Sequence, residues 1–385
     1  MTHPTTAIRL NPFKGCVGPS GKTVPWNEYG RILDERPVFT LDPLYHAGCY
    51  YVQDSSAMYV GHIFRKLLKV GGFGKGIRVL DLCAAPGGKT TDLAASLREA
   101  FGSDFTLVAN EVMKQRASVL LDNVRIWGDS RVAVTSVDPA AFASLPGCFD
   151  IVVADVPCSG EGMFRKDARA VEEWSEDTVQ LCASRQMRIL ADMWPCLKEG
   201  GYLIYSTCTY ERCENDDNLQ WAASRLGGEI VPPKDEFPQY GVRVTEAGNL
   251  LKAGEVPGEG QWVGALRKTV PSCSIGKKDD FELRLAGLKP LRTGAVKGVM
   301  KGNKFVPDPS WALDLDFDAD AYPMAELDRQ TALKYLHRDS IELVNAPLGY
   351  NVVAFEGHPL GFVNNVGKRC NNLYPLSRRI LMDVI

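Results

Sequence analysis

The sequence predicts an α/β protein with a doubly wound parallel sheet and a smaller β-rich domain at its C-terminal end. Two observations lead to this fold class. From Gly71 onward, short apolar runs alternate with helical stretches, and near the C-terminus short strands are separated by glycines. The chain has 385 residues, 45% of them hydrophobic, which is enough for two or three domains with cores of their own.

The central sheet is expected to consist of strands connected by helices. Strands are predicted at Ile77–Leu82, Thr106–Asn110, Val132–Ser136, Phe149–Ala154 and Tyr202–Ser206, and helices at about Ser55–Leu68, Lys89–Phe101, Lys114–Trp127 and Asp177–Leu197. Because strands and helices alternate, the connections are crossovers and consecutive strands run parallel. Upstream, prolines 12, 19, 25, 37 and 43 divide the chain into short extended pieces and turns.

The chain changes character beyond Lys268. Arg284–Lys304 contains six Lys or Arg and no acid, whereas Asp308–Asp328 contains seven acids and no base. Charge runs of this kind are usually solvated, so we expect a linker or inserted surface element over residues 271–326. A small β-rich domain should follow, with a helix at Thr331–His337 and strands such as Val352–Phe355 and Leu360–Val363.

The composition limits the function classes. There are 47 Asp and Glu against 44 Lys and Arg, a net charge of −3, which excludes a wholly basic nucleic-acid binder. No apolar run reaches the roughly eighteen residues of a membrane span, and residues 1–10 lack a signal core. We therefore expect a soluble, cytoplasmic, monomeric protein that does not bind a membrane.

The 11 cysteines predict neither a disulfide framework nor a metal site. Their number is odd, no Cys-x-x-Cys pair occurs, and the 5 histidines show no ligand spacing, which argues against structural zinc. For most of them we expect a small, buried hydrophobic side chain in a reducing compartment.

A ligand-binding loop is predicted between the first strand of the sheet and the following helix, at Cys83, Ala84, Ala85, Pro86, Gly87, Gly88 and Lys89. Small residues let a backbone pass close to a ligand, and a helix N-terminus favours negatively charged groups. A Walker A loop would need glycine where Cys83 stands, and the Gly-x-Gly-x-x-Gly dinucleotide pattern is absent. By themselves, two adjacent glycines are more typical of a tight turn.

Three acids at strand ends favour a nucleotide-like ligand. Asp81 ends the first strand, Glu111 follows the second and Asp138 follows the third, and the ends of parallel strands open into one crevice. Glu111 comes 23 residues after Gly88, where a carboxylate would accept ribose hydroxyls, and Asp138 is placed to accept from an adenine amino group. The pattern suits S-adenosylmethionine as well as any nucleotide.

Two cysteines follow the next two strands. Cys158 lies in Asp155-Val156-Pro157-Cys158, and Cys208 lies in Thr207-Cys208-Thr209-Tyr210. Since sequential strands are usually neighbours, both thiols should converge on the same crevice. A lone cysteine there would most often be structural, but two thiols at the ligand edge indicate chemistry.

The methylation of a pyrimidine at C5 would use both thiols. Cytosine C5 is too weak a nucleophile to take a methyl group directly, but a thiolate that adds to C6 creates an enamine whose C5 can attack a sulfonium methyl. A base must then remove the C5 proton so that the thiolate can leave. Asp155 could hydrogen-bond to cytosine N3 or the exocyclic amine and stabilise charge during the addition.

Three motifs resemble the Nol/Nop/Sun family of RNA cytosine-C5 methyltransferases: Asp81–Thr90 (DLCAAPGGKT), Asp155–Lys166 (DVPCSGEGMFRK) and Ser206–Tyr210 (STCTY). The resemblance implies a Rossmann-like methyltransferase sheet, with Cys208 as the nucleophile and Cys158 assisting release of the methylated base. It further implies a pocket for S-adenosylmethionine and the base, lined by Cys83–Lys89, Glu111, Arg116, Asp138 and Asp155.

Further segments are similar to the bacterial branch of this family that acts on small-subunit ribosomal RNA, the RsmF type: Ala7–Asn11, Tyr45–Met58 and Asn110–Arg116. Gly357–Ile380 resembles the PUA-like, RNA-binding tail of that branch. The resemblance implies that Lys368, Arg369, Arg378 and Arg379 contact phosphates and that Tyr374 stacks on a base, although each could equally be ordinary surface.

The chain also departs from the family pattern. It begins almost at the Arg-Leu-Asn motif, so the usual N-terminal helical segment is expected to be missing. Val156 replaces the usual alanine, and the segment before Gly258–Lys268, the expected last strand, lacks the usual histidine. The predicted domains are a shortened RNA-recognition segment (1–68), a catalytic domain (69–270), the linker or insert (271–326) and a PUA-like domain (327–385).

Three other functions remain open. In a DNA cytosine methyltransferase the Pro-Cys cysteine, Cys158, is the nucleophile, which would leave Cys208 unexplained. A tRNA cytosine-C5 methyltransferase would use the same chemistry on another RNA. An inactive RNA-binding assembly factor would be expected to have lost a thiol or the cofactor loop. The activation of Cys208 is unexplained, because no lysine or histidine adjoins it in the sequence.

Overall fold

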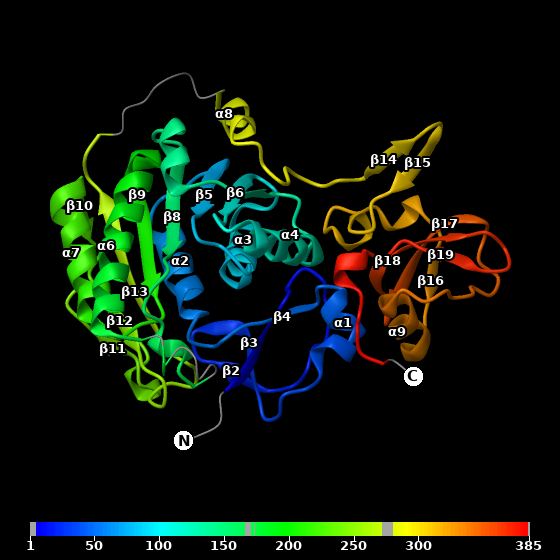
Figure 1. Cartoon of the computed structure of the whole chain (residues 1–385), viewed down its shortest axis with the longest axis horizontal. Helices are drawn as coiled ribbons and strands as arrows, with labels where there is room; N and C mark the ends of the chain where they lie inside the picture. The colour runs from blue at the N-terminus through cyan, green and yellow to red at the C-terminus, as the bar shows by residue number, and fades with distance from the viewer. Residues whose placement is uncertain (1–4, 166–170, 173, 272–279, 384–385) are drawn as a thin grey trace.

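The computed structural model describes residues 5–165, 171–172, 174–271 and 280–383, and its centre is a nine-stranded mixed sheet (Figure 1). Five strands run parallel: β5 (Ile77–Asp81), β6 (Phe105–Asn110), β7 (Val132–Thr135), β8 (Phe149–Asp155) and β9 (Leu197–Thr207). Their order, β9-β8-β5-β6-β7, reverses direction at β5, as a doubly wound sheet requires.

The remaining strands of this sheet are antiparallel. β13 (Gln261–Lys268) pairs with β9, and the edge is extended by β12 (Gly248–Leu251), β11 (Arg243–Val244) and β10 (Gly228–Ile230). The predicted parallel strands and the last strand are thus confirmed, while the other antiparallel additions were not predicted.

Helices cover both faces of the sheet. One hydrophobic core packs against α2 (Tyr59–Val70), α3 (Gly88–Phe101) and α4 (Lys114–Trp127). The opposite core packs against α6 (Glu176–Met193) and α7 (Asp216–Ala222). Alternate strand residues divide between them, so that Val79 faces the first core and Leu80 the second. This is expected when helices bury both faces of a sheet.

The N-terminal residues form a small antiparallel sheet instead of separate extended pieces. Its order is β2-β3-β1-β4, with β1 (Thr6–Leu10), β2 (Lys22–Val24), β3 (Asn27–Leu33) and β4 (Tyr50–Val52), and α1 (Pro43–His46) precedes β4. Arg9 on β1 is fully buried, and its guanidinium donates to Gln53 Oε1 (2.9 Å) and to the Gly88 carbonyl (3.1 Å). The sheet is therefore fastened to the start of α3.

A second small sheet follows near the C-terminus. It has the order β16-β17-β18-β19, formed by β16 (Met324–Glu326), β17 (Gly349–Phe355), β18 (His358–Asn365) and β19 (Cys370–Asn372), with α9 (Arg329–His337) beside it. One hydrophobic core joins this sheet to the N-terminal one, including Ile8 and Tyr50 on one side and Tyr335 and Val363 on the other. Figure 1 shows α1 next to α9 at this junction.

The segment predicted as a solvated linker packs against the catalytic domain, so that prediction was wrong for several of its residues. In α8 (Phe281–Gly287), Phe281 and Leu285 are buried in the core. Arg292, from the basic block, is buried 3.5 Å from Asp314 of the acidic block. The hairpin β14 (Gly298–Lys301) and β15 (Lys304–Pro307) is largely exposed, as predicted. The two charge blocks thus pair with each other in part.

One cysteine pair differs from the sequence prediction. Cys16 and Cys49 form a disulfide, although most cysteines were expected to be reduced and eight described ones are free. Within the described part of the chain, no helix is long and apolar enough to cross a membrane.

Candidate active site

The predicted ligand loop links the end of β5 to the start of α3. Its backbone is held from two sides: the Ala84 N–H donates to the Asn110 carbonyl (2.8 Å), and the Arg116 guanidinium donates to the Ala85 carbonyl (2.8 Å). Gly87 has a φ of +115°, which a residue with a side chain rarely adopts. The loop is therefore a preformed turn whose last residues lie at a helix N-terminus.

Asp81 provides an unused acceptor beside this loop. Its Oδ2 accepts from Thr90 Oγ1 (2.6 Å), but its buried Oδ1 has no partner. Burial raises the pKa of this carboxyl to about 7. A buried polar atom without a partner is costly, so the position fits a ligand that donates a hydrogen bond or carries positive charge. S-adenosylmethionine, with its ammonium and sulfonium groups, is such a ligand.

The two other acids at strand ends, Glu111 and Asp138, differ in their exposure to solvent. Glu111 is buried, accepts from the Met113 N–H (2.9 Å) and lies 3.1 Å from Arg116. The predicted pair Glu111 and Arg116 is thus brought to the cofactor loop. Asp138 is exposed, and its carboxylate accepts from the Ala140 N–H (3.0 Å). Its carboxylate therefore faces solvent, unlike that of Glu111.

The two predicted thiols meet at the ends of β8 and β9. Asp155 and Ser206 are paired in register, so the turns that follow these strands lie side by side. Cys158 Sγ is 3.2 Å from Cys208 Sγ and accepts from the Cys208 N–H at 3.3 Å. The last residue of the first cysteine motif, Lys166, lies outside the described residues.

Lys89 and Asp155 form an ion pair next to these thiols. Lys89 Nζ is 2.8 Å from Asp155 Oδ2, while the other oxygen accepts from Ser206 Oγ (2.7 Å) and Gln261 Nε2 (3.0 Å). Burial opposes the charge on Lys89, but Asp155 outweighs it and raises the pKa of the lysine. Lys89 therefore brings a positive charge from the cofactor loop to the thiols, a role that the sequence did not reveal.

The surroundings of the two thiols give them different pKa values. A hydrogen bond from the Cys158 thiol lowers the pKa of Cys208, and the positive charge of Lys89 lowers it further, against the effects of burial and Asp155. The same hydrogen bond, together with burial, raises the pKa of Cys158. Cys208 is therefore the more acidic thiol of the pair.

Three segments of the chain match the domains of one methyltransferase type. Residues 74–226 match the family described as 16S rRNA methyltransferase RsmB/F. Residues 1–55 match the N-terminal domain of RsmF, and residues 323–380 match its PUA domain. The chain is also 36% identical to the ribosomal RNA small subunit methyltransferase F of Klebsiella pneumoniae (strain 342), over 98% of this chain and 89% of that protein. The chain belongs to the RsmF family.

Other relatives agree with this family. The protein of the same description from Escherichia coli O157:H7 is 30% identical over 98% of the chain and 90% of its own length. A solved methyltransferase homologue from Pyrococcus horikoshii is 27% identical, with a TM-score of 0.57, covering 69% of this chain and 87% of that one. NSun6 from the same organism, solved with SFG, has 21% identity and a TM-score of 0.50, covering 61% of this chain and 57% of its own, and supports the fold alone. Membership makes the chain an S-adenosylmethionine-dependent methyltransferase.

Two acids that were not predicted as site residues accept hydrogen bonds from the turns that contain Cys158 and Cys208 in this RsmF-family site. Glu214 is fully buried, and its carboxylate accepts from the Ser159 N–H (3.1 Å) and from Gln186 Nε2 (2.7 Å). Burial raises its pKa. Glu161 accepts from Thr209 Oγ1 (2.8 Å) and from the Tyr210 N–H (2.6 Å). Only Glu161 had a sequence signal, since it lies in the motif Asp155–Lys166.

The residues predicted to bind RNA in the PUA domain fall into two groups. Lys368, Arg369 and Arg379 are exposed. Arg378 is half-buried over the ring of Tyr374, and its Nη2 donates to Ser310 Oγ (3.2 Å). Tyr374 is 1% exposed, with its hydroxyl 3.0 Å from His46 Nδ1. The prediction that Tyr374 stacks on a base is therefore contradicted, since its ring belongs to the core.

Proposed function

We propose that this protein methylates C5 of a cytosine in 16S ribosomal RNA by a covalent mechanism, with Cys208 as the nucleophile and Cys158 assisting release. The observation that carries the mechanism is the pair of thiols 3.2 Å apart at adjacent strand ends, with the lower pKa on Cys208. A DNA-type mechanism, which uses the Pro-Cys cysteine, would assign the nucleophile to the thiol whose pKa is raised.

The residues divide the reaction between them. The Cys208 thiolate adds to cytosine C6, and the Asp155 carboxylate accepts from the exocyclic amine, which orients the ring. Lys89 stabilises the thiolate before the addition. Bound S-adenosylmethionine supplies the electrophilic methyl group that C5 takes. The C5 proton then passes to solvent with the assistance of Cys158, its bonding electrons re-form the C5–C6 double bond, and Cys208 leaves C6 as the thiolate.

The cofactor would lie against the loop between β5 and α3. The backbone of Cys83–Lys89 forms one wall, Glu111 would accept ribose hydroxyls, and Arg116 holds Glu111 and the loop in place. Asp138 would contribute only at the rim. The unpartnered Oδ1 of Asp81 supports a positively charged ligand group nearby.

The RNA would be held by the outer domains. We assign residues 1–68 and 327–385 to RNA recognition and residues 69–270 to catalysis, with 271–326 packed beside the catalytic domain. Lys368, Arg369 and Arg379 are exposed charges of the kind that contact phosphates. The target cytosine must be unpaired or flipped out to reach the thiols.

The test supplies 16S rRNA, both protein-free and in small ribosomal subunits, with methyl-labelled S-adenosylmethionine. Nuclease digestion and mass spectrometry should then detect 5-methylcytidine with the native protein and none with Cys208→Ser. Cys148→Ser, which changes a free cysteine outside the site, is the control that should retain activity. Methylation that survives in Cys208→Ser would overturn the mechanism. If DNA or tRNA supplied in parallel took up the label and 16S rRNA did not, the assignment of 16S rRNA as the substrate would be overturned.

A further inference from the structure

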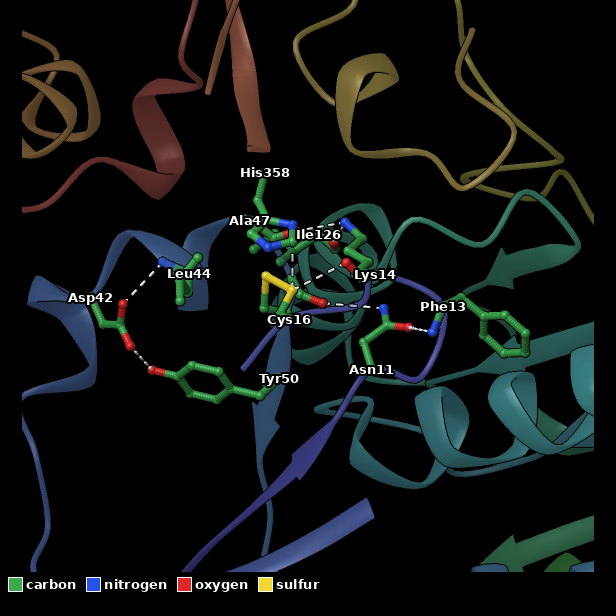
Figure 2. The surroundings of a disulfide bond; sticks show 12 residues. Asn11, Phe13, Lys14, Cys16, Asp42, Leu44, Ala47, Tyr50, Ile126 and His358 are labelled. Atoms are coloured by element: carbon green, nitrogen blue, oxygen red, sulfur yellow. Dashed lines mark hydrogen bonds between the residues drawn. A yellow bond between two sulfur atoms is a disulfide. The ribbon is translucent and has the colours of Figure 1, made fainter. Parts of the chain in front are cut away.

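Three metal-binding side chains from distant parts of the sequence meet outside the active site. Cys16 lies in the loop after β1, Cys49 immediately precedes β4, and His358 begins β18 of the PUA domain. Figure 2 shows the disulfide between the two cysteines with His358 above it. His358 Nδ1 is 3.6 Å from Cys16 Sγ, and the three donor atoms all lie within 4.8 Å of one another.

These distances are close to those of a metal site. Zinc binds sulfur at about 2.3 Å and nitrogen at about 2.0–2.1 Å in a tetrahedron, which places a sulfur and a nitrogen ligand roughly 3.5 Å apart. The observed separation of 3.6 Å is close to this value. Two sulfurs on one zinc ion lie roughly 3.8 Å apart, farther than in a disulfide, so the half-buried side chain of Cys16 would have to turn away from Cys49 after reduction.

We propose that Cys16, Cys49 and His358 bind a thiophilic divalent cation of the zinc type when the disulfide is reduced. Two equivalents of a small thiol reduce the disulfide, leaving two thiols on the protein and one small-molecule disulfide. Each thiol then gives its proton to solvent as its sulfur coordinates the ion. Water completes the tetrahedron, since the cluster contains three protein donors among the described residues.

A lysine, Lys14, lies near this cluster, and its positive charge would repel a bound cation. Two backbone carbonyls reduce this repulsion. Lys14 Nζ donates to the carbonyl of Ala47 and to that of Ile126 (3.3 Å). Two carbonyl dipoles therefore take up much of the ammonium charge. The thiolates, which lower the charge of the bound ion by two units, reduce the remaining repulsion.

The ion would tie the PUA domain to the catalytic domain. Asn11 lies shortly before Cys16 in the same loop, and its Nδ2 donates to the carbonyl of Gly48 (3.1 Å), next to Cys49, and to the carbonyl of Trp127 (3.1 Å), the last residue of α4. His358 belongs to the strand that pairs with β17. A single ion therefore joins the N-terminal sheet, and through it α4, to the C-terminal sheet.

The experiment measures zinc bound to the full-length chain by inductively coupled plasma mass spectrometry. The background carries Cys158→Ser and Cys208→Ser, which removes the other close thiol pair. The protein is reduced with a phosphine, incubated with Zn²⁺ and desalted. We expect about one zinc per chain in this background and in the controls Cys370→Ser and His337→Ala, and at least a tenfold loss in Cys49→Ser and His358→Ala.

Because His358 is only partly buried, His358→Ala should fold even if Cys49→Ser does not. Substitution by Co²⁺ provides a second measure, since thiolate ligands give a charge-transfer band that must vanish in Cys49→Ser and weaken in His358→Ala. The proposal is overturned if the reduced chain binds no zinc, or if zinc remains in both ligand variants. It is also overturned if the disulfide survives millimolar concentrations of a small thiol.

Discussion

Lys89 links the cofactor loop to Cys208, the proposed nucleophile. Replacing it with glutamine removes a positive charge near Cys208 and leaves the Asp155 carboxylate without its ion-pair partner, and both changes raise the pKa of Cys208. The thiolate forms above this pKa, so the acid limb of kcat/KM against pH should move to higher pH in Lys89→Gln. Lys89→Arg, which keeps the charge, should move it much less. An acid limb that stays in place in Lys89→Gln would show that Lys89 does not activate Cys208.

Asp81 should make the free energy of unfolding depend on pH. Its pKa is raised by burial to about 7 in the folded protein, above the usual value near 3.9 for an unfolded chain. The protonated form is therefore the favoured one in the fold. Its contribution to stability is complete below about pH 4 and is lost as pH rises through about 7, at up to about 1.4 kcal/mol per pH unit.

Asp81→Asn tests this dependence, because asparagine stays neutral and can still accept from Thr90 Oγ1. Urea unfolding of both proteins between pH 5 and pH 8 should show the variant gaining stability relative to the native protein as pH rises. A difference in unfolding free energy that is constant across this range would mean that Asp81 does not titrate there.

Some single-residue roles were predictable from the sequence and others were not. The convergence of Cys158 and Cys208 was predictable, because successive strands of a doubly wound sheet are neighbours. The role of Lys89 was not, since it is 119 residues from Cys208 in the chain and reaches it only through the fold. Tyr374 was misassigned because an aromatic residue beside arginines looks the same in sequence whether it faces RNA or the core.

At the scale of secondary-structure elements, the turn after β8 depends on a buried carboxylate from the segment that follows β9. Glu214→Ala would leave the Ser159 N–H without its acceptor and Gln186 Nε2 with the Pro157 carbonyl alone, at a cost of about 1–3 kcal/mol for an unsatisfied buried donor. Cys158 should then lose its position relative to Cys208. We predict slower release of methylated RNA and a roughly tenfold longer-lived covalent protein–RNA adduct, for a loss of about 1.4 kcal/mol in that step.

The adduct should be followed on denaturing gels during turnover. Glu214→Gln, which keeps an acceptor for the same donors, should restore much of the release rate. Glu229→Ala changes an exposed acid on β10 and serves as the control. If Glu214→Ala lowered all steps equally, without accumulation of adduct, Glu214 would be only a structural residue.

The parallel strands were predictable because each is an apolar run with a helical stretch on at least one side. The short N-terminal strands were not, since β2 has three residues and its partners are fixed by contacts across the fold. The packing of residues 271–326 was not predictable either. Arg292 lies in a basic block and Asp314 in an acidic block, and the sequence does not show that the two side chains pair with each other.

At the scale of the whole molecule, the two outer domains share one hydrophobic core. Deleting residues 327–385 would expose Ile8, Leu44 and Tyr50, so a truncated chain would test stability as much as RNA binding. Charge reversal at exposed residues separates the two, because it leaves the core intact.

The double variant Lys368→Glu with Arg369→Glu should bind 16S rRNA more weakly, and the loss should not depend on the RNA sequence, because phosphate contacts are the same at every nucleotide. The slope of log affinity against log salt should fall by roughly 1.5, the effect of two lost phosphate contacts, while affinity for S-adenosylmethionine stays the same. The matched control is Lys301→Glu with Lys304→Glu on the exposed hairpin. Equal RNA affinity and equal salt slope in the first variant would remove these residues from the RNA interface.

The central claim is the division of labour between the two thiols. Its most direct test is a denaturing gel of Cys158→Ala incubated with 16S rRNA and S-adenosylmethionine. We predict a slowly migrating protein–RNA band that resists denaturant and disappears when Cys208 is also replaced. A band that forms with Cys208→Ser alone, while Cys158 is intact, would contradict the account and make Cys158 the nucleophile.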